Sequence, residues 1–224
     1  MDEYFLEKKS EFMANFKQFN SIMGELIGEK YGEKFANTVL KEISNEYESI
    51  YEKIPYIGGD SNLLTFDLES AAENLAAYLV LKREGKPLSE IGEISYKACE
   101  KIYNLHPEIA PKSSPEYIPY IKKAAEESLK RKYPDDWVYT FIEGDGESDY
   151  GLDFTECGIV KLFNKYNADE FVPYLCAMDI IMSDASNAGI HRSETLAEGG
   201  KKCDFRYKTD RETRIKSTVR DSIH

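Results

Sequence analysis

The residues best suited to chemistry are concentrated between positions 153 and 207. This segment contains three of the four cysteines, Cys157, Cys176 and Cys203, together with two arginines, Arg192 and Arg206. A thiolate is a nucleophile and a metal ligand, and a guanidinium group binds a carboxylate through paired hydrogen bonds. A functional site is therefore expected in this part of the chain.

Cys157 is the leading candidate for a catalytic nucleophile. It lies between a β-rich run that ends at Phe154 and a predicted helix. Its sulfur should therefore approach backbone N–H groups and the positive end of a helix dipole, and both favour the thiolate. The alternative is a small buried apolar residue that closes the turn from strand to helix.

Asp179 is a candidate catalytic carboxyl on an apolar helix. It lies three residues after Cys176, hence on the same helix face, and its neighbours include Met178 and Ile180. A carboxylate in such surroundings needs a partner or acquires a raised pKa. It could orient a histidine or an arginine, or act as a base. The alternatives are that Asp179 faces solvent and that Cys176 only packs.

His191 and Arg192 are neighbours on a predicted strand, so their side chains should point to opposite faces. His191 is the available general acid or base, although a lone histidine is also common as a surface or core residue. The guanidinium group of Arg192 or of Arg206 is suited to hold a substrate carboxylate in a bidentate pair.

Cys203 is a second candidate nucleophile. On its predicted strand, Cys203 and Phe205 alternate with Asp204 and Arg206, so one pair should face the core and the other should not. The alternative is an edge strand with the aspartate and the arginine in solvent.

The first half of the chain is predicted to be helical. Apolar residues recur at helical spacing over residues 11–54, with a break between Gly28 and Gly32. Residues 66–84 are the most apolar segment and predict a central buried helix that ends at Gly85. Further helices are expected over residues 89–104 and 118–133, and the proline-rich residues 106–119 between them predict a linker or a surface crossing.

The second half is predicted to alternate between hairpins and helices. Residues 137–142 and 150–154 indicate a β-hairpin, and residues 158–166 and 169–188 indicate two helices, the second with Asp169 as its N-cap. Residues 190–196 and 203–208 indicate a second hairpin. The fold class is thus α+β: N-terminal helices followed by an antiparallel sheet of two β-hairpins with two helices between them.

Length and charge restrict the function classes. The 224 residues are interpreted as one domain, with a helical part (1–133), a hairpin and helix part (134–208) and a polar tail (209–224) that is frayed or a short surface helix. The net charge of −12 argues against nucleic-acid binding. Acidic residues at the start and the lack of a long apolar run predict a soluble, cytoplasmic protein with no membrane partner and free thiols. A homo-oligomer is compatible with the sequence.

The arrangement of these residues resembles a known family. Arg192, Thr195 and Gly199 followed by the run Cys203-Asp-Phe-Arg206 give the pattern R-x-x-T-x-x-x-G-x-x-x-C-D-F-R. This ending, with Cys157 and Asp179 upstream, is similar to the L-2-amino-thiazoline-4-carboxylic acid hydrolase family. The resemblance covers about the last third of the chain.

The resemblance implies hydrolytic opening of a 2-aminothiazoline ring through a carbamoylated cysteine, without a cofactor. The target carbon is bonded to two nitrogens and a sulfur, and a thiolate or an activated water can attack it to give a tetrahedral adduct. Cys157 or Cys203 would be the nucleophile in the first case, with Asp179 or His191 moving protons. The substrate-binding residues would be Arg192 or Arg206 for the ring carboxylate, and Thr195 and Asp204 for further polar contacts.

A second likeness leads to a different function class. The order of helix, hairpin and Gly-x-x-x-Cys-Asp-Phe is also similar to the vinyl-4-reductase-like ligand-binding domains. In that interpretation the chain is a non-catalytic module that binds a small molecule or a metal. Cys157, Cys176, Cys203 and Asp179 would then be possible ligands of a tetrahedral zinc ion, although no two of the cysteines are closely spaced in the sequence.

Overall fold

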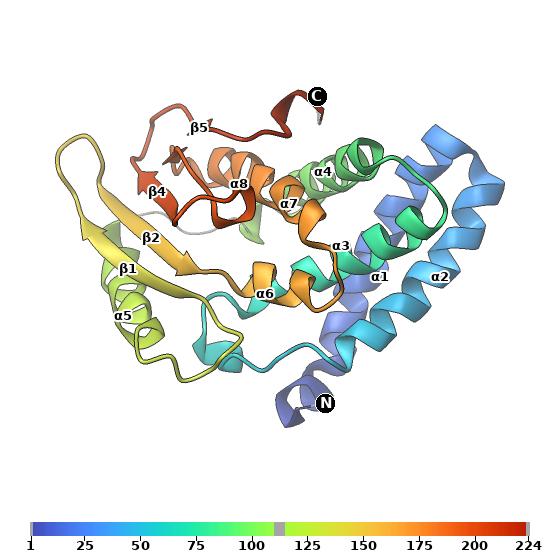
Figure 1. The fold of residues 1–224 in the computed structure, drawn as a ribbon, viewed down its shortest axis with the longest axis horizontal. Coiled ribbons are helices and arrows are strands. Elements are labelled where there is room, and N and C mark those ends of the chain that lie inside the picture. Colours follow the sequence, from blue (N-terminus) through green and yellow to red (C-terminus); the bar gives the residue numbers. More distant parts are fainter. Residues whose placement is uncertain (1, 110–114, 223–224) are drawn as a thin grey trace.

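The computed structural model describes residues 2–109 and 115–222, and the N-terminal half of this part is helical (Figure 1). Its helices are α1 (Glu3–Tyr31), α2 (Glu33–Tyr51), α3 (Thr65–Arg83), α4 (Leu88–Leu105) and α5 (Ile118–Ser128). The break between α1 and α2 was expected and falls at Gly32, whose φ is +89°. Residues 110–114 of the predicted crossing lie outside the described residues.

Helix α1 begins eight residues earlier than the apolar spacing predicted. The side chain of Asp2 caps it by accepting a hydrogen bond from the backbone N–H of Tyr4 (3.0 Å). Phe5 is buried and makes edge-to-face contact with Tyr51 of α2, so the first turn packs like the rest of the helix. An N-cap and one aromatic anchor are sufficient to extend the helix to Glu3.

Helix α3 is the centre of the helical half, as its composition predicted. It contacts α2, α4 and α6, and its buried side chains cover most of its circumference.

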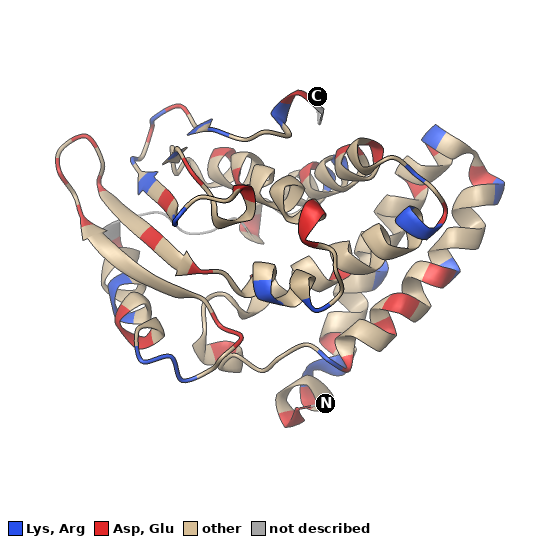
Figure 2. Ribbon diagram, viewed as in Figure 1, with Lys and Arg blue, Asp and Glu red and all other residues tan. Residues whose placement is uncertain are grey.

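Charged residues are frequent along α1 and α2, which lie at the edge of the molecule (Figure 2). Within the described ranges, none of the helices has the length and apolar character needed to cross a membrane.

The C-terminal half forms one five-stranded sheet with the order β1-β2-β4-β3-β5. The strands are β1 (Val138–Glu143), β2 (Tyr150–Glu156), β3 (His191–Arg192), β4 (Cys203–Tyr207) and β5 (Arg214–Ile215). The α+β class and the first hairpin are confirmed. The second hairpin is reduced to one antiparallel residue pair, His191 with Arg206.

Strand β5 corrects two expectations about the sheet and the tail. It pairs parallel to β3, so the sheet is mixed and not purely antiparallel. The tail after Thr209 is anchored because the backbone N–H groups of Arg214 and Lys216 donate to the carbonyl oxygens of Ile190 (2.7 Å) and Arg192 (3.0 Å). Ile215 is buried, which adds an apolar contact that a frayed tail would lack.

The predicted helix over residues 169–188 is divided. A 3-10 turn at Asp169–Phe171 leads into α7 (Val172–Ala177), and α8 (Asp179–Ser186) follows after Met178. Asp169 is therefore part of the turn and not an N-cap. Pro173 stands in the first turn of α7, where its missing N–H costs no helical hydrogen bond. The preceding helix is α6 (Gly158–Asn164), shorter than expected.

The strand register divides the side chains between two faces of the sheet. Opposed residues of an antiparallel pair share a face, and the pairs Phe154–Cys203 and Leu152–Phe205 belong to the hydrophobic core shared with the helices. We call this the inner face. The outer face carries Asp153, Asp204, Arg206 and His191.

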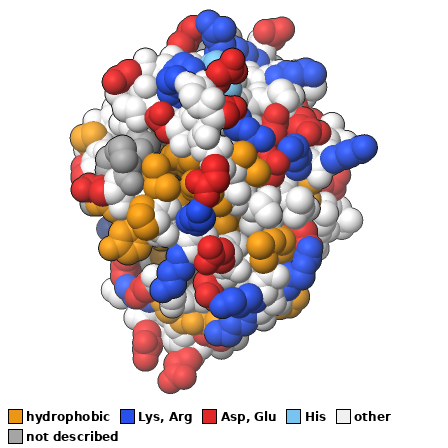
Figure 3. Space-filling model, turned by 90° about the vertical axis from the view of Figure 1, so that its left-hand side faces the viewer, with side chains coloured by type: hydrophobic (Ala, Val, Ile, Leu, Met, Phe, Trp, Pro, Cys, Tyr) orange, Lys and Arg blue, Asp and Glu red, His pale blue; other side chains and the backbone are white. Residues whose placement is uncertain are grey.

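On the side of the molecule that carries the β1–β2 hairpin, hydrophobic side chains gather near the middle, with charged ones around them (Figure 3).

The contact between α4 and α7 gives a test of the packing. A Cβ atom added at Gly92 would overlap the ring of Tyr174, so Gly92→Ala should lower the free energy of unfolding by about 1–3 kcal/mol. Gly28→Ala is the control, because its nearest neighbour would be the Cβ of Ala36 at 3.8 Å and alanine is the better helix former. Urea unfolding should show opposite changes, and equal stabilities would contradict the packing.

Candidate functional site

Arg192 connects the sheet to the helices α7 and α8. Its guanidinium group donates hydrogen bonds to Asp179 at the start of α8 and to the carbonyl oxygen of Cys176 in α7 (3.1 Å). It also lies over the ring of Phe205, with its central carbon 5.1 Å from the ring centroid. The side chain is only 1% exposed. Strand β3 therefore inserts a cation between the sheet and its covering helices.

Asp179 retains access to solvent although it lies deep in the molecule. Burial raises the pKa of its carboxyl, while the charge and hydrogen bond of Arg192 act in the opposite direction. Its side chain is still 23% exposed.

Asp67, in the first turn of α3, interacts electrostatically with Asp179. Burial and the nearby charge of Asp179 raise the pKa of Asp67 to about 7, and its side chain is partly exposed. Two tyrosines lie within electrostatic reach: burial raises the pKa of Tyr103 and of Tyr207, and the charges of Asp67 and Asp179 raise them further. We refer to Asp67, Tyr103, Asp179, Arg192 and Tyr207 as the inner site.

Burial raises the pKa of all three thiols of the functional segment. Cys157 caps α6, and the backbone N–H groups at its N-terminus lower the thiol pKa as expected from the sequence, but burial is the larger effect and raises it to about 11. Burial also raises the pKa of Cys203, whose sulfur accepts a hydrogen bond from the backbone N–H of Leu196 (3.2 Å). Burial raises the pKa of Cys176 well above its ordinary value.

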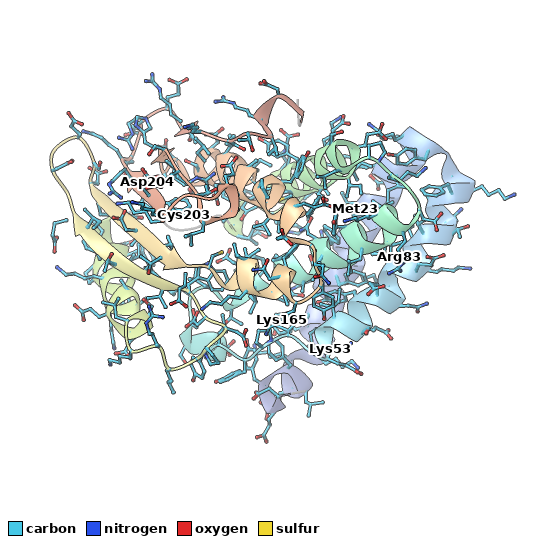
Figure 4. All side chains as sticks on the ribbon, in the orientation of Figure 1. Met23, Lys53, Arg83, Lys165, Cys203 and Asp204 are labelled. Atoms are coloured by element: carbon cyan, nitrogen blue, oxygen red, sulfur yellow. The ribbon has the colours of Figure 1, made fainter. Side chains whose placement is uncertain are left out.

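The remaining predicted residues are on the outer face or in the turn that follows β3. Arg206 pairs with Asp153 at 2.8 Å, and its neighbour on β4, Asp204, accepts hydrogen bonds from the backbone N–H groups of Ser193 and Glu194 (both 2.8 Å). Charged residues on β2 and β4 can be followed in Figure 2, and Cys203 and Asp204 are labelled on β4 in Figure 4.

Thr195 and His191 also lie outside the inner site. Thr195 is buried, and its hydroxyl oxygen accepts a hydrogen bond from the backbone N–H of Glu198 (3.2 Å), which caps a short 3-10 turn. Burial lowers the pKa of His191, and the charges of Arg211 and Arg214 add to this effect. The opposite orientation of His191 and Arg192 follows the strand alternation predicted from the sequence.

The comparison with known families identifies the family of the chain. A model of the L-2-amino-thiazoline-4-carboxylic acid hydrolase family matches residues 69–207. The chain belongs to this family. No curated protein matches the chain. The segment shared with the hydrolase family contains Cys157, Asp179, Arg192 and Cys203, and it begins two residues after Asp67.

Asp67 was missed by the sequence interpretation. An aspartate in the first turn of a helix is common because it interacts favourably with the helix dipole, so its residue type gave no sign of another role. Asp67 and Asp179 are also more than a hundred residues apart, so the sequence did not indicate that they interact.

In the described part of the chain, no three histidine, cysteine or acidic side chains are grouped so that they could hold a metal ion.

Proposed function

We propose that this hydrolase family member opens the ring of a small cyclic amidine-like carboxylate of the L-2-amino-thiazoline-4-carboxylate type. The observation that carries the proposal is the Arg192–Asp179 pair, in which a buried cation is paired with a carboxyl whose side chain remains 23% exposed. The family match supports the substrate type. The reaction adds one water and breaks one ring bond, so the product is a carbamoylated cysteine.

Arg192 is better placed than Arg206 to bind the ring carboxylate. Arg206 is occupied by Asp153 on the outer face. The Nε–H of Arg192 is buried and has no hydrogen-bond partner among the described residues, although both terminal nitrogens of the same group are used. A substrate carboxylate would supply the missing acceptor and would leave the ring carbon on the side of the carboxyls.

Water is the nucleophile that the thiol environments favour. A thiol must ionise to attack, and burial opposes this at Cys157, Cys176 and Cys203. In the proposed step, Asp179 accepts a proton as the water oxygen bonds to the ring carbon. The tetrahedral adduct then collapses, and the departing ring atom takes up a proton.

The cysteine variants test this proposal. Turnover of the thiazoline acid should be retained within about threefold in Cys157→Ser and in Cys203→Ser, because neither sulfur bonds to the substrate. The measurement is the appearance of the carbamoylated product by chromatography. Loss of turnover in a variant that still folds would indicate attack by that thiol. Absence of turnover in the unmodified protein would favour the non-catalytic binding module.

A further inference from the structure

Phe205 is an aromatic residue in direct contact with the proposed carboxylate-binding group. Its ring faces the guanidinium group of Arg192, whose central carbon lies 5.1 Å from the ring centroid. The arginine side chain is only 1% exposed, so water does not screen the contact. A cation is attracted to an aromatic face, and the attraction is strongest where the pair is desolvated. The contact should therefore restrain the guanidinium group.

The ring of Phe205 is itself held on several sides. It makes an edge-to-face contact with Phe154 of β2, with centroids 5.5 Å apart, and it stacks on Tyr207 of its own strand at 6.0 Å. Aromatic pairs at such separations are stabilising. The ring also packs against the main hydrophobic core and against the small cluster that contains Ile215 of β5. Arg192 thus lies against a ring that cannot turn away freely.

Hydrogen bonds alone leave one movement of the Arg192 guanidinium group free. Its terminal nitrogens donate to Asp179 and to the carbonyl oxygen of Cys176 (3.1 Å). Two bonds at one end of a planar group fix that end, but the plane can still tilt about the line that joins them. The ring of Phe205 lies against the plane and opposes this tilt. The tilt would redirect the buried Nε–H, which has no hydrogen-bond partner among the described residues.

We propose that Phe205 is a positioning residue, whose ring holds the guanidinium plane of Arg192 so that the free Nε–H stays directed at the carboxylate of a ligand. The inference rests on the proposed function for the identity of that ligand. The restraint on the arginine, however, can be measured in the unligated protein. A donor that is already ordered binds its acceptor more tightly, because less conformational entropy is lost on binding.

NMR of the Arg192 Nε–H in isotope-labelled protein tests the restraint without a ligand, and the signal is identified by its loss in Arg192→Lys. Phe205→Leu keeps an apolar side chain but has no aromatic face. In this variant the proton should exchange with water at least about fivefold faster, the effect of losing a desolvated cation–π contact. Phe205→Tyr keeps the ring and should retain the slow exchange.

Phe141→Leu is the matched control. Phe141 is also partly buried in the sheet and also lies under a cation, but that cation is the exposed Lys122, with its Nζ 5.5 Å from the ring centroid. The exchange of the Arg192 proton should be unchanged in this variant. Unchanged exchange in folded Phe205→Leu, or equally faster exchange in Phe141→Leu, would overturn the positioning role, and thermal unfolding verifies that each variant is folded.

Calorimetric titration with L-thiazolidine-4-carboxylate measures the consequence for binding, because this acid has the ring and the carboxylate but no amidine to hydrolyse. Phe205→Leu should bind it at least about fivefold more weakly than the unmodified protein. Equal, measurable affinity of the two proteins would contradict the inference. Faster proton exchange without binding to either protein would uphold the restraint on Arg192 and count against the proposed function alone. In an active enzyme, KM for the thiazoline acid should rise by the same factor with kcat nearly unchanged.

Discussion

Replacement of Arg192 by methionine is expected to lower the free energy of unfolding by about 3 kcal/mol and to abolish turnover. Removal of one partner of a buried ion pair leaves the other charge uncompensated, which typically costs about 3–5 kcal/mol. The lower end applies because Asp179 is 23% exposed and can be partly solvated. The variant also loses the hydrogen bond to the Cys176 carbonyl oxygen. Urea unfolding measures the first effect and product formation the second.

The double variant Asp179→Asn with Arg192→Met distinguishes the ion pair from general packing. Removing both charges eliminates the uncompensated carboxylate, so the double variant should be more stable than Arg192→Met alone. If the two substitutions were simply additive, Arg192 would contribute through its packing on Phe205 and not through Asp179. Neither variant should bind the thiazoline acid well, whereas 2-amino-2-thiazoline, which lacks the carboxylate, should lose much less affinity.

Local periodicity was sufficient to predict the parts of the fold that are regular. The alternation of Cys203 and Phe205 with Asp204 and Arg206 predicted that one pair faces the core and the other does not, because successive strand side chains point to opposite faces. The same rule separated His191 from Arg192. The expectation that Cys157, Asp179, Arg192 and Cys203 line one cavity stays a prediction, although Arg192 and Asp179 do form an ion pair.

Short and non-local features could not be read in this way. Strand β5 has two residues, and its pairing with β3 depends on backbone hydrogen bonds that leave no periodic pattern. The electrostatic interaction of Asp67 with Asp179 depends on tertiary packing, which residue types alone do not specify. The sequence also indicated a helix dipole at Cys157 but not the extent of its burial, and burial determines the direction of its pKa shift.

Two glutamates inside the helical half should make stability depend strongly on pH. Glu69 and Glu73 are one helical turn apart on α3, and they are 1% and 5% exposed. The hydroxyl of Tyr47 donates a hydrogen bond to Glu69, while one oxygen of each carboxyl has no partner among the described residues. Burial raises the pKa of Glu69 to about 7, and burial and the charge of Glu69 raise the pKa of Glu73 well above its ordinary value.

These shifts predict that the protein loses stability as the pH rises from about 4.5 through 7 and beyond. In this window the folded state retains protons that the unfolded state has released, so the free energy of unfolding decreases with pH. Glu73→Gln is neutral at every pH and can donate a hydrogen bond to Glu69. It should match the unmodified protein near pH 4.5 and exceed it at pH 8 by a few kcal/mol, since one pKa unit corresponds to about 1.4 kcal/mol.

Urea unfolding of both proteins from pH 4.5 to pH 8 measures this difference directly. Glu48→Gln, an exposed position on α2, is the control and should follow the unmodified protein throughout. A difference between Glu73→Gln and the unmodified protein that stays constant over this range would mean that Glu73 is not held protonated in the fold. The pH at which the stability difference stops increasing would report the folded pKa of the carboxyl pair. Above that pH both glutamates have ionised in the unmodified protein.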